Sequence, residues 1–454
     1  MKWLAVVSAV VLAAGCKNKE VPYKPPPKDD AAVVAIDAGA AVDAPAAAET
    51  PTAKKVVVGD EFSCALLADE SVRCWGKNSE GQLGNGTTTD SGKPVNVGLR
   101  GVQDLVAGPA HVCALLDDRS VTCWGRINYG KRDNLTRPAA APGVSKVQRI
   151  FAVRSASCAT TDDAALVCWG DIDPSGHLRL AGGSNERRVP SPAAGLDHVV
   201  ALTTNGALHA DGRVSFWGAD GDPKPTAIRD AVEIASSGDE ICALRKNGTV
   251  ACVGPSTRCA AMAPKPPPAP KAPAKKAPAK KAPAKKATAK KTAKKPASKA
   301  KVAAAKPKAA PAKTEAKPAE MPFEVLRLPT AKHLAFDVGL CVVTMTGKLQ
   351  CLEPADSCKL ASPWPNLANV ESVAGRCARI RDGSVRCWAV DLRSRVVSAV
   401  AGVVKAALLA ASSSHACAVI SDGQIICWGS NRFGALGRGE AEEADHPEGR
   451  AVEF

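Results

Sequence analysis

The amino-acid sequence predicts an all-β repeat protein. One pattern recurs eight times: an apolar strand, a Cys, nine residues with an acidic or glycine-containing turn in the middle, a second Cys and, in most copies, Trp-Gly. Apart from one longer interval, the copies follow one another at about 36 to 49 residues, a period typical of solenoids and propellers. Each copy holds two short strands around a turn, so each is expected to be a β-hairpin.

The two cysteines of each copy are expected to form a disulfide. In the fourth copy both are replaced together, by Gly206 and Phe216, while the rest of the pattern is kept. Each pair is symmetric about its turn, which places the cysteines opposite each other on antiparallel strands, where Cα separations of roughly 4.5 to 5.5 Å suit a disulfide. Seven bridges are predicted: Cys64–Cys74, Cys113–Cys123, Cys158–Cys168, Cys242–Cys252, Cys341–Cys351, Cys377–Cys387 and Cys417–Cys427.

The turns and the apolar positions agree with stacked hairpins. Asp-Gly or Asn-Gly stands at several turns, for example Asp382-Gly383, and these residues tolerate the positive φ of tight hairpin loops. Strand alternation places the residue two before the second Cys on the same face as that Cys. This residue is apolar in every copy, so stacked hairpins would bury that face: Val72, Val121, Leu166, Val214, Val250, Leu349, Val385 and Ile425.

Three cysteines remain outside these pairs. Cys259 and Cys358 each lie seven residues beyond the second Cys of copies five and six, so a bridge between neighbouring repeats is expected, with two free thiols as the alternative. The third is Cys16. Zinc sites use shorter spacings and clustered ligands, so no metal site is expected. His111 and His415 both stand two places before a first Cys, a repeat position that indicates packing or hydrogen bonding rather than catalysis.

The N-terminus resembles a bacterial lipoprotein signal. Lys2 is followed by an apolar run from Trp3 to Ala14 and by the lipobox-like Leu12-Ala13-Ala14-Gly15-Cys16. The run is too short to span a bilayer and has signal-peptide proportions. The resemblance implies a signal peptide over residues 1–15, lipidation of Cys16, and sorting to the outer membrane because Lys17 follows. An ordinary signal peptide with a chance cysteine is the alternative.

Two segments have compositions that cannot bury a core. Residues 16–54 are rich in Pro, Ala, Asp and Lys, which predicts a disordered tether between the lipid and the folded domain. Export also suits the many disulfides. Residues 260–321 form a second such segment, rich in Lys, Ala and Pro and inserted between copies five and six, and it resembles linker-histone tails in composition.

The insertion carries the positive charge of the chain. The insertion has eighteen lysines and two glutamates, a net charge of +16. The whole chain has a net charge of +15, so the repeats are close to neutral. The segment holds no aromatic residue on which bases could stack, so any nucleic-acid binding would be independent of sequence. A solvated spacer, an arm binding polyanions (lipopolysaccharide, wall polymer or extracellular DNA) and a specific partner motif all remain open. The polyanion-binding candidates are Lys271, Lys275, Lys276, Lys280, Lys281, Lys285 and Lys286.

The segments after Trp-Gly in the first and last copies carry a specific resemblance. Lys77–Gly86 and Ser430–Gly439, with Ala-Leu, Asp-Gly and Trp-Gly before them, resemble the repeat of the regulator-of-chromosome-condensation family. The resemblance covers residues 55–259 and 322–454 and implies a β-propeller, usually of seven blades, in two parts. Eight copies favour eight blades. The chain departs from the pattern where Val253 and Leu352 replace the Trp.

The C-terminal residues suggest how such a ring would close. Ala451-Val452-Glu453-Phe454 resembles Pro94-Val95-Asn96-Val97, a strand that the first copy lacks on its N-terminal side. We therefore expect the C-terminal strand to close the ring by completing the first blade.

The resemblance implies a binding protein. Family members include a nuclear guanine-nucleotide exchange factor, a plant light receptor and a secreted bacterial inhibitor of β-lactamase, which share protein binding by a propeller face. An exported chain would not meet cytosolic GTPases, so no GTPase partner is expected. No catalytic constellation, cofactor or metal motif stands out in the sequence. The expectation is a non-enzymatic envelope lipoprotein that binds an unidentified protein, with an adhesive or envelope-organising protein acting through the lysine-rich loop as the alternative.

Overall fold

The computed structural model describes residues 51–127, 134–170, 190–218, 221–237, 240–254, 320–321, 323–326, 328–336, 339–352, 363–364, 367–389 and 396–454. They belong to the unit Thr50–Phe454. Cys16 and the signal segment, the tether up to residue 50, the lysines of the insertion, and Cys259 and Cys358 lie outside the described residues, so these predictions stay predictions.

The described residues form strands and turns, with no helix. Correspondingly, no helix in this part of the chain is long and apolar enough to cross a membrane. The strands of blades 1 to 4 are β1 (Ala53–Val58), β2 (Phe62–Leu67), β3 (Val72–Gly76), β4 (Ser91–Asn96), β5 (Val102–Ala107), β6 (His111–Leu116), β7 (Val121–Gly125), β8 (Leu135–Ala140), β9 (Val147–Val153), β10 (Ala156–Thr161), β11 (Ala165–Gly170), β12 (Ser191–Asp197), β13 (Val199–Leu202), β14 (Gly206–His209), β15 (Val214–Phe216) and β16 (Lys224–Pro225).

The strands of blades 5 to 8 are β17 (Ala231–Ser237), β18 (Glu240–Arg245), β19 (Val250–Val253), β20 (Glu324–Leu326), β21 (Ala331–Phe336), β22 (Leu340–Thr344), β23 (Leu349–Cys351), β24 (Val370–Ala374), β25 (Cys377–Ile380), β26 (Val385–Trp388), β27 (Val397–Ala399), β28 (Ala406–Ala411), β29 (His415–Ile420), β30 (Ile425–Asn431) and β31 (Glu442–Ala451).

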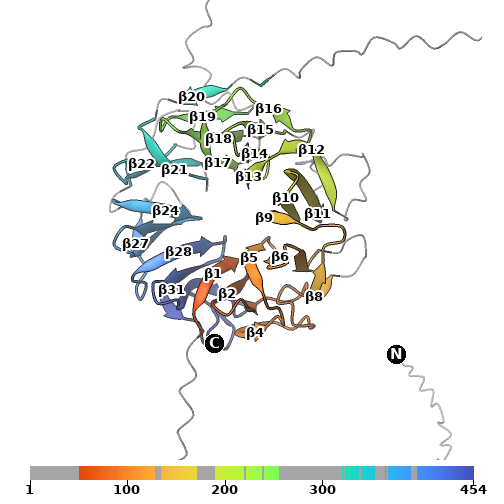
Figure 1. Cartoon of the computed structure of the whole chain (residues 1–454). Coiled ribbons are helices and arrows are strands. Elements are labelled where there is room, and N and C mark those ends of the chain that lie inside the picture. The colour runs from red at the N-terminus through yellow and green to blue at the C-terminus, as the bar shows by residue number, and fades with distance from the viewer. Residues whose placement is uncertain are drawn as a thin grey trace, which may run out of the picture. The chain divides into compact units, whose positions relative to one another are not determined.

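Each blade is an antiparallel sheet whose strands follow one another in chain order. Seven blades have four strands, and the sixth has three within the described residues. Figure 1 shows the sheets arranged around one axis, with the first strand of every blade nearest the centre and the last strand outside. The predicted all-β propeller is confirmed, and the blade number, open between seven and eight in the sequence, is eight.

The repeated hairpin is the second and third strand of each blade, in the predicted register. Cys64 stands opposite Cys74, and the other cysteine pairs are aligned in the same way. All seven pairs form disulfides with Cα separations of 3.9 to 4.1 Å, which confirms the intra-blade disulfides. The cysteines occupy non-hydrogen-bonded pairs, the closer of the two kinds of antiparallel pair, and their separations lie below even the roughly 4.5 Å expected there. The apolar residues two places before each second Cys are all buried.

The fourth blade replaces the disulfide by apolar packing. Gly206 and Phe216 stand opposite each other, where the cysteines stand in the other blades. A Cβ atom on Gly206 would lie 2.0 Å from Cδ1 of Ile241, so this side chain of the fifth blade fills the space above the glycine. Phe216 and Ile241 are both buried in the cluster between these two blades.

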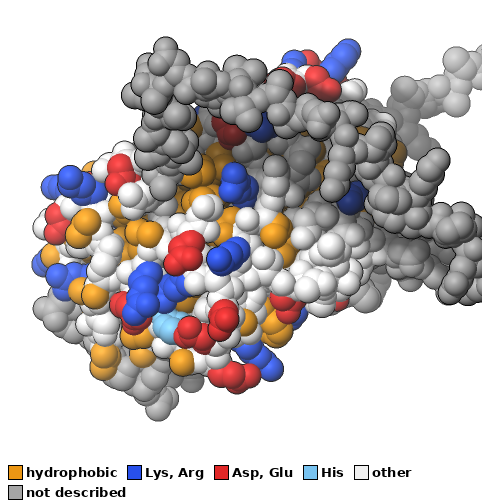
Figure 2. Space-filling model, turned by 90° about the horizontal axis from the view of Figure 1, so that it is seen from below, with side chains coloured by type: hydrophobic (Ala, Val, Ile, Leu, Met, Phe, Trp, Pro, Cys, Tyr) orange, Lys and Arg blue, Asp and Glu red, His pale blue; other side chains and the backbone are white. Residues whose placement is uncertain are grey.

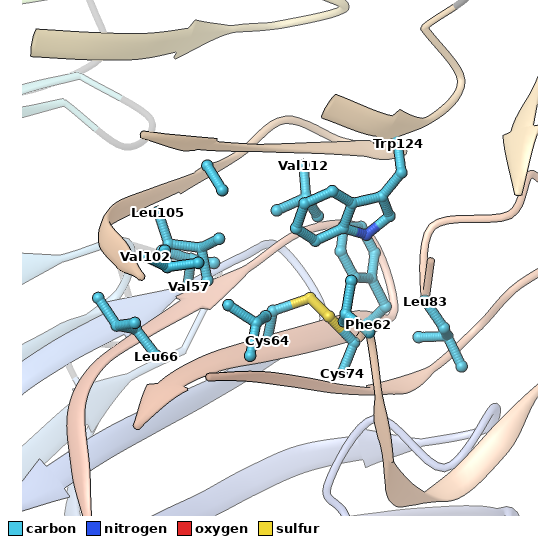
Figure 3. Close-up of a cluster of buried hydrophobic side chains, with 13 residues drawn as sticks. Val57, Phe62, Cys64, Leu66, Cys74, Leu83, Val102, Leu105, Val112 and Trp124 are labelled. Carbon is cyan, nitrogen blue, oxygen red and sulfur yellow. A yellow bond between two sulfur atoms is a disulfide. The ribbon is translucent and has the colours of Figure 1, made fainter. Parts of the chain in front are cut away.

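The core is divided into eight clusters, one between each pair of neighbouring blades. The cluster between blades 1 and 2 is drawn in Figure 3, where Phe62 and the Cys64–Cys74 disulfide of blade 1 lie beside Trp124 of blade 2. The apolar face that a hairpin cannot bury alone is therefore covered by the next blade, as the repeat pattern requires.

The Gly-rich segments of blades 1 and 8 each receive the tryptophan of the next blade. Trp124 Nε1 donates to the carbonyl of Gln82, 2.9 Å away, and Trp75 Nε1 donates to the equivalent carbonyl of Ala435, 2.8 Å away. A buried asparagine shapes each segment from within. Asn78 Oδ1 accepts from the amide of Leu83, and Asn431 Oδ1 accepts from the amide of Leu436. The motif that carried the family resemblance thus joins neighbouring blades.

The ring closes between blade 8 and blade 1 without an exchanged strand. β31 pairs with β30 of its own blade, and β1 to β4 complete the first blade by themselves. The expectation that the C-terminal strand completes the first blade is therefore wrong. The C-terminal segment still closes the ring, by packing: Val452 is buried in the cluster that contains Trp75, and the Phe454 ring centroid lies 6.1 Å from that of Trp75.

Candidate functional site

The two ends of the propeller differ in what they expose. We call the end with the turns between second and third strands, and with the connections from blade to blade, the turn end. The opposite end, the loop end, carries the Gly-rich segments Asn78–Gly86 and Asn431–Gly439. Since all strands run between these two ends, a residue is assigned to an end by its place in the strand order.

The acidic residues at the tips of the turns stabilise the turns themselves. Asp69 Oδ1 accepts from the amide of Ser71 at 3.1 Å, and Asp118 Oδ1 accepts from the amide of Ser120 at 2.8 Å. The serine hydrogen bonds hold the pKa of both carboxyls below the usual value. Asp211, Asn247, Asp382 and Asp422 make the same contact in their blades. The glycines of the predicted turns have the expected positive φ, for example +80° at Gly383, and the amide contacts account for the turn carboxylates without a ligand.

Every inner strand is interrupted by a β-bulge near its start, at the turn end. The register shifts between Ala53 and Lys55 in the first blade, and the other seven blades repeat this shift at the equivalent place. A bulge re-aims side chains and is common next to binding sites. We call the bulged residues and those that follow them the bulge ring: Lys54, Lys55, Gln103, Asp104, Gln148, Arg149, Val200, Ala201, Val232, Glu233, Lys332, His333, Glu371, Ser372, Ala407 and Leu408.

Side chains of the bulge ring meet across neighbouring blades. Lys55 Nζ lies 2.7 Å from Asp104 Oδ1, and the equivalent positions of blades 5 and 6 bring His333 Nδ1 within 3.3 Å of Glu233 Oε2. Burial raises the pKa of Glu233. The sequence had not singled out these residues. The sequence feature that marks a bulge is a pair of buried apolar residues three positions apart, such as Ala53 and Val56. In a regular strand, buried residues are two positions apart.

Large apolar side chains are exposed at the turn end of blades 5 to 8. Val232 and Leu408 of the bulge ring are 50% and 45% exposed, and Met345 and Val404, on turns and connections, are each 62% exposed. Together these four residues are called the apolar arc. The two other large apolar residues with high exposure in the described chain are Val325, on an outer strand, and Val396, at the loop end.

Blades 1 to 4 present ion pairs at the same end. Arg100 pairs with Asp69 at 2.9 Å, Arg119 pairs with Asp162 of the next blade, and Arg213 pairs with Asp197 at 3.2 Å. Blades 5 to 8 have ion pairs at this end too, such as Arg245 with Asp230 at 2.9 Å and Arg379 with Glu371 at 2.8 Å, and what distinguishes this half is its exposed large apolar side chains. Figure 2 views the molecule along a different direction, from below Figure 1, and shows basic and acidic side chains interspersed among its coloured residues.

The histidines of the repeat lie between blades and not in an open site. His111 Nε2 lies 2.8 Å from Ser157 Oγ of the next blade, and all of these side chains are buried. Burial, with the Arg126 guanidinium adding to it, lowers the pKa of His111 to about 4, and burial lowers that of His415 to about 4. Such imidazoles are neutral and closed to substrate, which agrees with the hydrogen-bonding role expected for His111 and His415.

One group in the described residues has the composition of a metal site. Carboxylate and sulfur atoms of Glu240, Cys242 and Cys252 lie within 4.8 Å of one another. Cys242 and Cys252 form a disulfide, however, so neither sulfur is the thiolate that a metal requires. The group is explained by the fold.

The return of the lysine-rich insertion is attached to the outer edge of blades 4 and 5. Glu320 Oε1 lies 2.6 Å from Arg229 Nη2, and Met321 forms a parallel bridge with Thr226. Phe323 lies under the Arg245 guanidinium, 5.9 Å from ring centroid to Cζ. The chain then enters β20, the outer strand of blade 5.

Two family models match parts of the chain. The model of the regulator of chromosome condensation (RCC1) repeat matches residues 53–82 and 406–435, and a second model of the same description matches residues 69–115. These segments are similar to the RCC1 repeat. They fall in blades 8, 1 and 2, which are neighbours in the ring although the sequence places them at opposite ends. The matched segments thus lie on either side of the junction where the ring closes.

Solved structures with low sequence identity are similar to this chain. Prp20p from Saccharomyces cerevisiae is 16% identical with a TM-score of 0.36, over 88% of this chain and 76% of that chain. Human WBSCR16 is 16% identical with a TM-score of 0.37, over 90% and 83%. The CRINKLY WD40 ectodomain of the Arabidopsis thaliana receptor kinase ACR4 is 15% identical with a TM-score of 0.39, over 87% and 100%. A search of curated proteins found no match.

Proposed function

We propose that this chain is a bacterial envelope lipoprotein whose propeller binds another protein at the turn end and catalyses no reaction. The single observation that carries the binding site is the apolar arc. Exposed apolar residues that are scattered singly are ordinary, whereas several on one surface indicate an interface. Four of the six highly exposed large apolar residues of the described chain lie at the turn end of blades 5 to 8.

The remainder of the turn end fits the surroundings of such an interface. Protein interfaces combine an apolar centre with a polar rim. The ion pairs of blades 1 to 4 provide a rim whose charges are already neutralised by one another, as for Arg100 and Asp69. The rigid disulfide-linked hairpins behind this surface hold it in one shape, which lowers the entropic cost of binding.

A binding role without catalysis agrees with the repeat type and with the site. Propellers built from RCC1 repeats are generally binding or regulatory proteins. The His415–Ser63 and His111–Ser157 pairs are buried between blades, and the His209–Ser215 pair is buried within the fourth blade. The address rests on the N-terminal sequence: the lipobox-like Leu12–Cys16 and the run before it support lipidation of Cys16, and Lys17 supports the outer membrane.

Site-specific photo-crosslinking in the native cell tests the proposed site. A photoreactive amino acid replaces Val404 in one strain and Val396 in another. The two residues are similarly exposed and eight positions apart, but they lie at opposite ends of the ring. We expect a discrete cross-linked species from Val404, and also from Met345, but none from Val396 or Val325. Equal products from both ends, or none from Val404 and Met345, would contradict the proposal.

A further inference from the structure

The bulge ring surrounds the propeller axis at the turn end, so it stands beside the apolar arc and shares Val232 and Leu408 with it. We propose that the bulge ring receives a loop of the partner protein whose tip carries a carboxylate next to a large apolar side chain. This inference rests on the proposed function, because it names the chemistry of the partner at the same end.

The carboxylates of the bulge ring are already engaged. Asp104 is paired with Lys55 at 2.7 Å, and Glu233 is paired with His333 at 3.3 Å. Glu371 accepts from Arg379, with 2.8 Å between Oε2 and Nη1. A cationic partner group would have to displace Lys55, Arg379 or the imidazole of His333 from these carboxylates, and each exchange would give up a contact that the ring already makes.

Some cations of the bulge ring have no carboxylate of the ring as a partner. Arg149 is exposed and Lys332 is half-buried, and neither has an ion pair or side-chain hydrogen bond with another described residue. Lys54 reaches a carboxylate only at 3.6 Å, the Oε1 atom of Glu70. The charge left without a partner is therefore positive, and Arg149 has the planar fork that binds a carboxylate with two parallel hydrogen bonds.

Apolar side chains stand next to Arg149 on one side, with Gln103 and Asp104 of blade 2 on the other. Going around the axis, Arg149 of blade 3 is followed by Val200 and Ala201 of blade 4 and Val232 of blade 5, and the sequence of blades returns through Ala407 and Leu408 of blade 8. An occupant that satisfies Arg149 thus meets apolar surface next to it. This combination favours a polypeptide loop over a nucleic acid, since a phosphate backbone needs a continuous row of cations and has no use for exposed valine and leucine.

Selection of constrained peptides tests this inference. A phage-displayed library of disulfide-cyclised peptides is panned against the full mature chain, and the enriched peptides are synthesised as they are and with Asp→Asn or Glu→Gln replacements. We expect enriched peptides to carry a carboxylate beside an apolar residue. Arg149→Ala and Leu408→Asp should each weaken their binding by about tenfold or more, and the amide replacements should do the same.

Matched variants at the loop end serve as controls. Arg126→Ala removes an exposed arginine that donates to Ser155 Oγ, and Val396→Asp changes an exposed valine. Both should leave peptide affinity within about twofold, and circular dichroism should confirm that all variants fold. Enriched peptides without a carboxylate, affinities that Arg149→Ala does not change, no enrichment at all, or competition by a duplex DNA would overturn the inference. Crosslinking from Val404 that survives Arg149→Ala would leave the proposed function standing while this inference fails.

Discussion

His415 of the last blade lies 2.8 Å from Ser63 of the first, measured from Nε2 to Oγ, although 352 residues separate them. His111 and Ser157 make the same contact between blades 2 and 3. Backbone hydrogen bonds at the two kinds of interface are also equivalent. The amide of Ala53 donates to the carbonyl of Gly423 across the junction, and the amide of Ala406 donates to the carbonyl of Gly383 at an internal interface. The junction of the ring is therefore an ordinary blade interface that happens to lack a covalent connection.

Removing this contact should destabilise the whole ring. His415→Ala leaves the buried hydroxyl of Ser63 without this partner and opens a cavity, so we expect a loss of about 2 to 4 kcal/mol in the free energy of unfolding. Urea denaturation measures the loss, and His111→Ala is the matched control at an internal interface. Similar losses support an equivalent junction, whereas a negligible effect of His415→Ala alone would show that the ring does not depend on it.

The same histidines predict how stability depends on pH. Their pKa is about 4 in the folded state and about 6.5 in the unfolded state, so the unfolded chain binds more protons between these values. The free energy of unfolding should therefore be unaffected by them above pH 7 and fall by about 2 kcal/mol per histidine between pH 7 and pH 5. Denaturation of His111→Gln/His415→Gln should show a correspondingly smaller fall. An identical pH profile for the variant and the natural chain would refute this assignment.

The Gly-rich segments should tolerate no side chain where the next tryptophan packs. Gly84 has φ +66°, and a Cβ there would lie 2.8 Å from Trp124 Cδ1. Gly98 has φ +81° with nothing within 4 Å of such a Cβ, so Gly98→Ala measures the backbone strain alone, about 1 kcal/mol. We expect Gly84→Ala to cost about 1 to 3 kcal/mol more than Gly98→Ala in thermal or urea unfolding. Equal costs would mean that Trp124 moves aside freely.

The disulfides should be present in protein isolated from the envelope. Peptide mapping under thiol-blocking conditions should link each predicted pair, from Cys64–Cys74 to Cys417–Cys427. Loop-closure entropy gives about 2.5 to 3 kcal/mol for one isolated bridge of this length, and the contributions of seven do not add. Mostly reduced cysteines would contradict both the disulfides and the exported address.

Lipid attachment at Cys16 can be tested separately. Cys16→Ser should abolish both lipid attachment and signal processing if Cys16 is the lipidated residue, and metabolic labelling with a fatty acid analogue reports the attachment directly. The processed, labelled natural chain is the control. Equal labelling of both proteins would exclude Cys16 as the anchor.

The hairpins could be predicted because their signals are local. The spacing of Cys64 and Cys74 and the buried Val72 follow from strand alternation and a tight turn, which depend on neighbouring residues alone. The closure of the ring depends on contacts between the first and last blades, which are far apart in the sequence. The similarity of Ala451–Phe454 to Pro94–Val97 therefore did not reveal that β31 pairs within the last blade.

The binding end escaped sequence reasoning for a related reason. In a single copy, the bulge at Lys54 is visible in the sequence merely as two polar residues between Ala53 and Val56. It can be recognised as a bulge when the eight inner strands are aligned, because all of them carry the same register shift. Met345 and Val404 stand in turns where a single apolar residue is unremarkable. They become informative once the fold places them at one end of the ring, because the significance of an exposed side chain lies in its neighbours.

Deletion of Lys265–Lys317 tests most directly whether the propeller, and not the lysine-rich insertion, binds the partner. The deletion removes the eighteen lysines of the insertion but leaves Gly254 and Glu320, where the described chain borders the insertion. The species cross-linked from Val404 should still form, and the circular dichroism of the propeller should not change. Loss of that species on deletion, together with binding to isolated envelopes that falls steeply between low and physiological salt in the intact chain alone, would contradict the account and assign binding to the insertion.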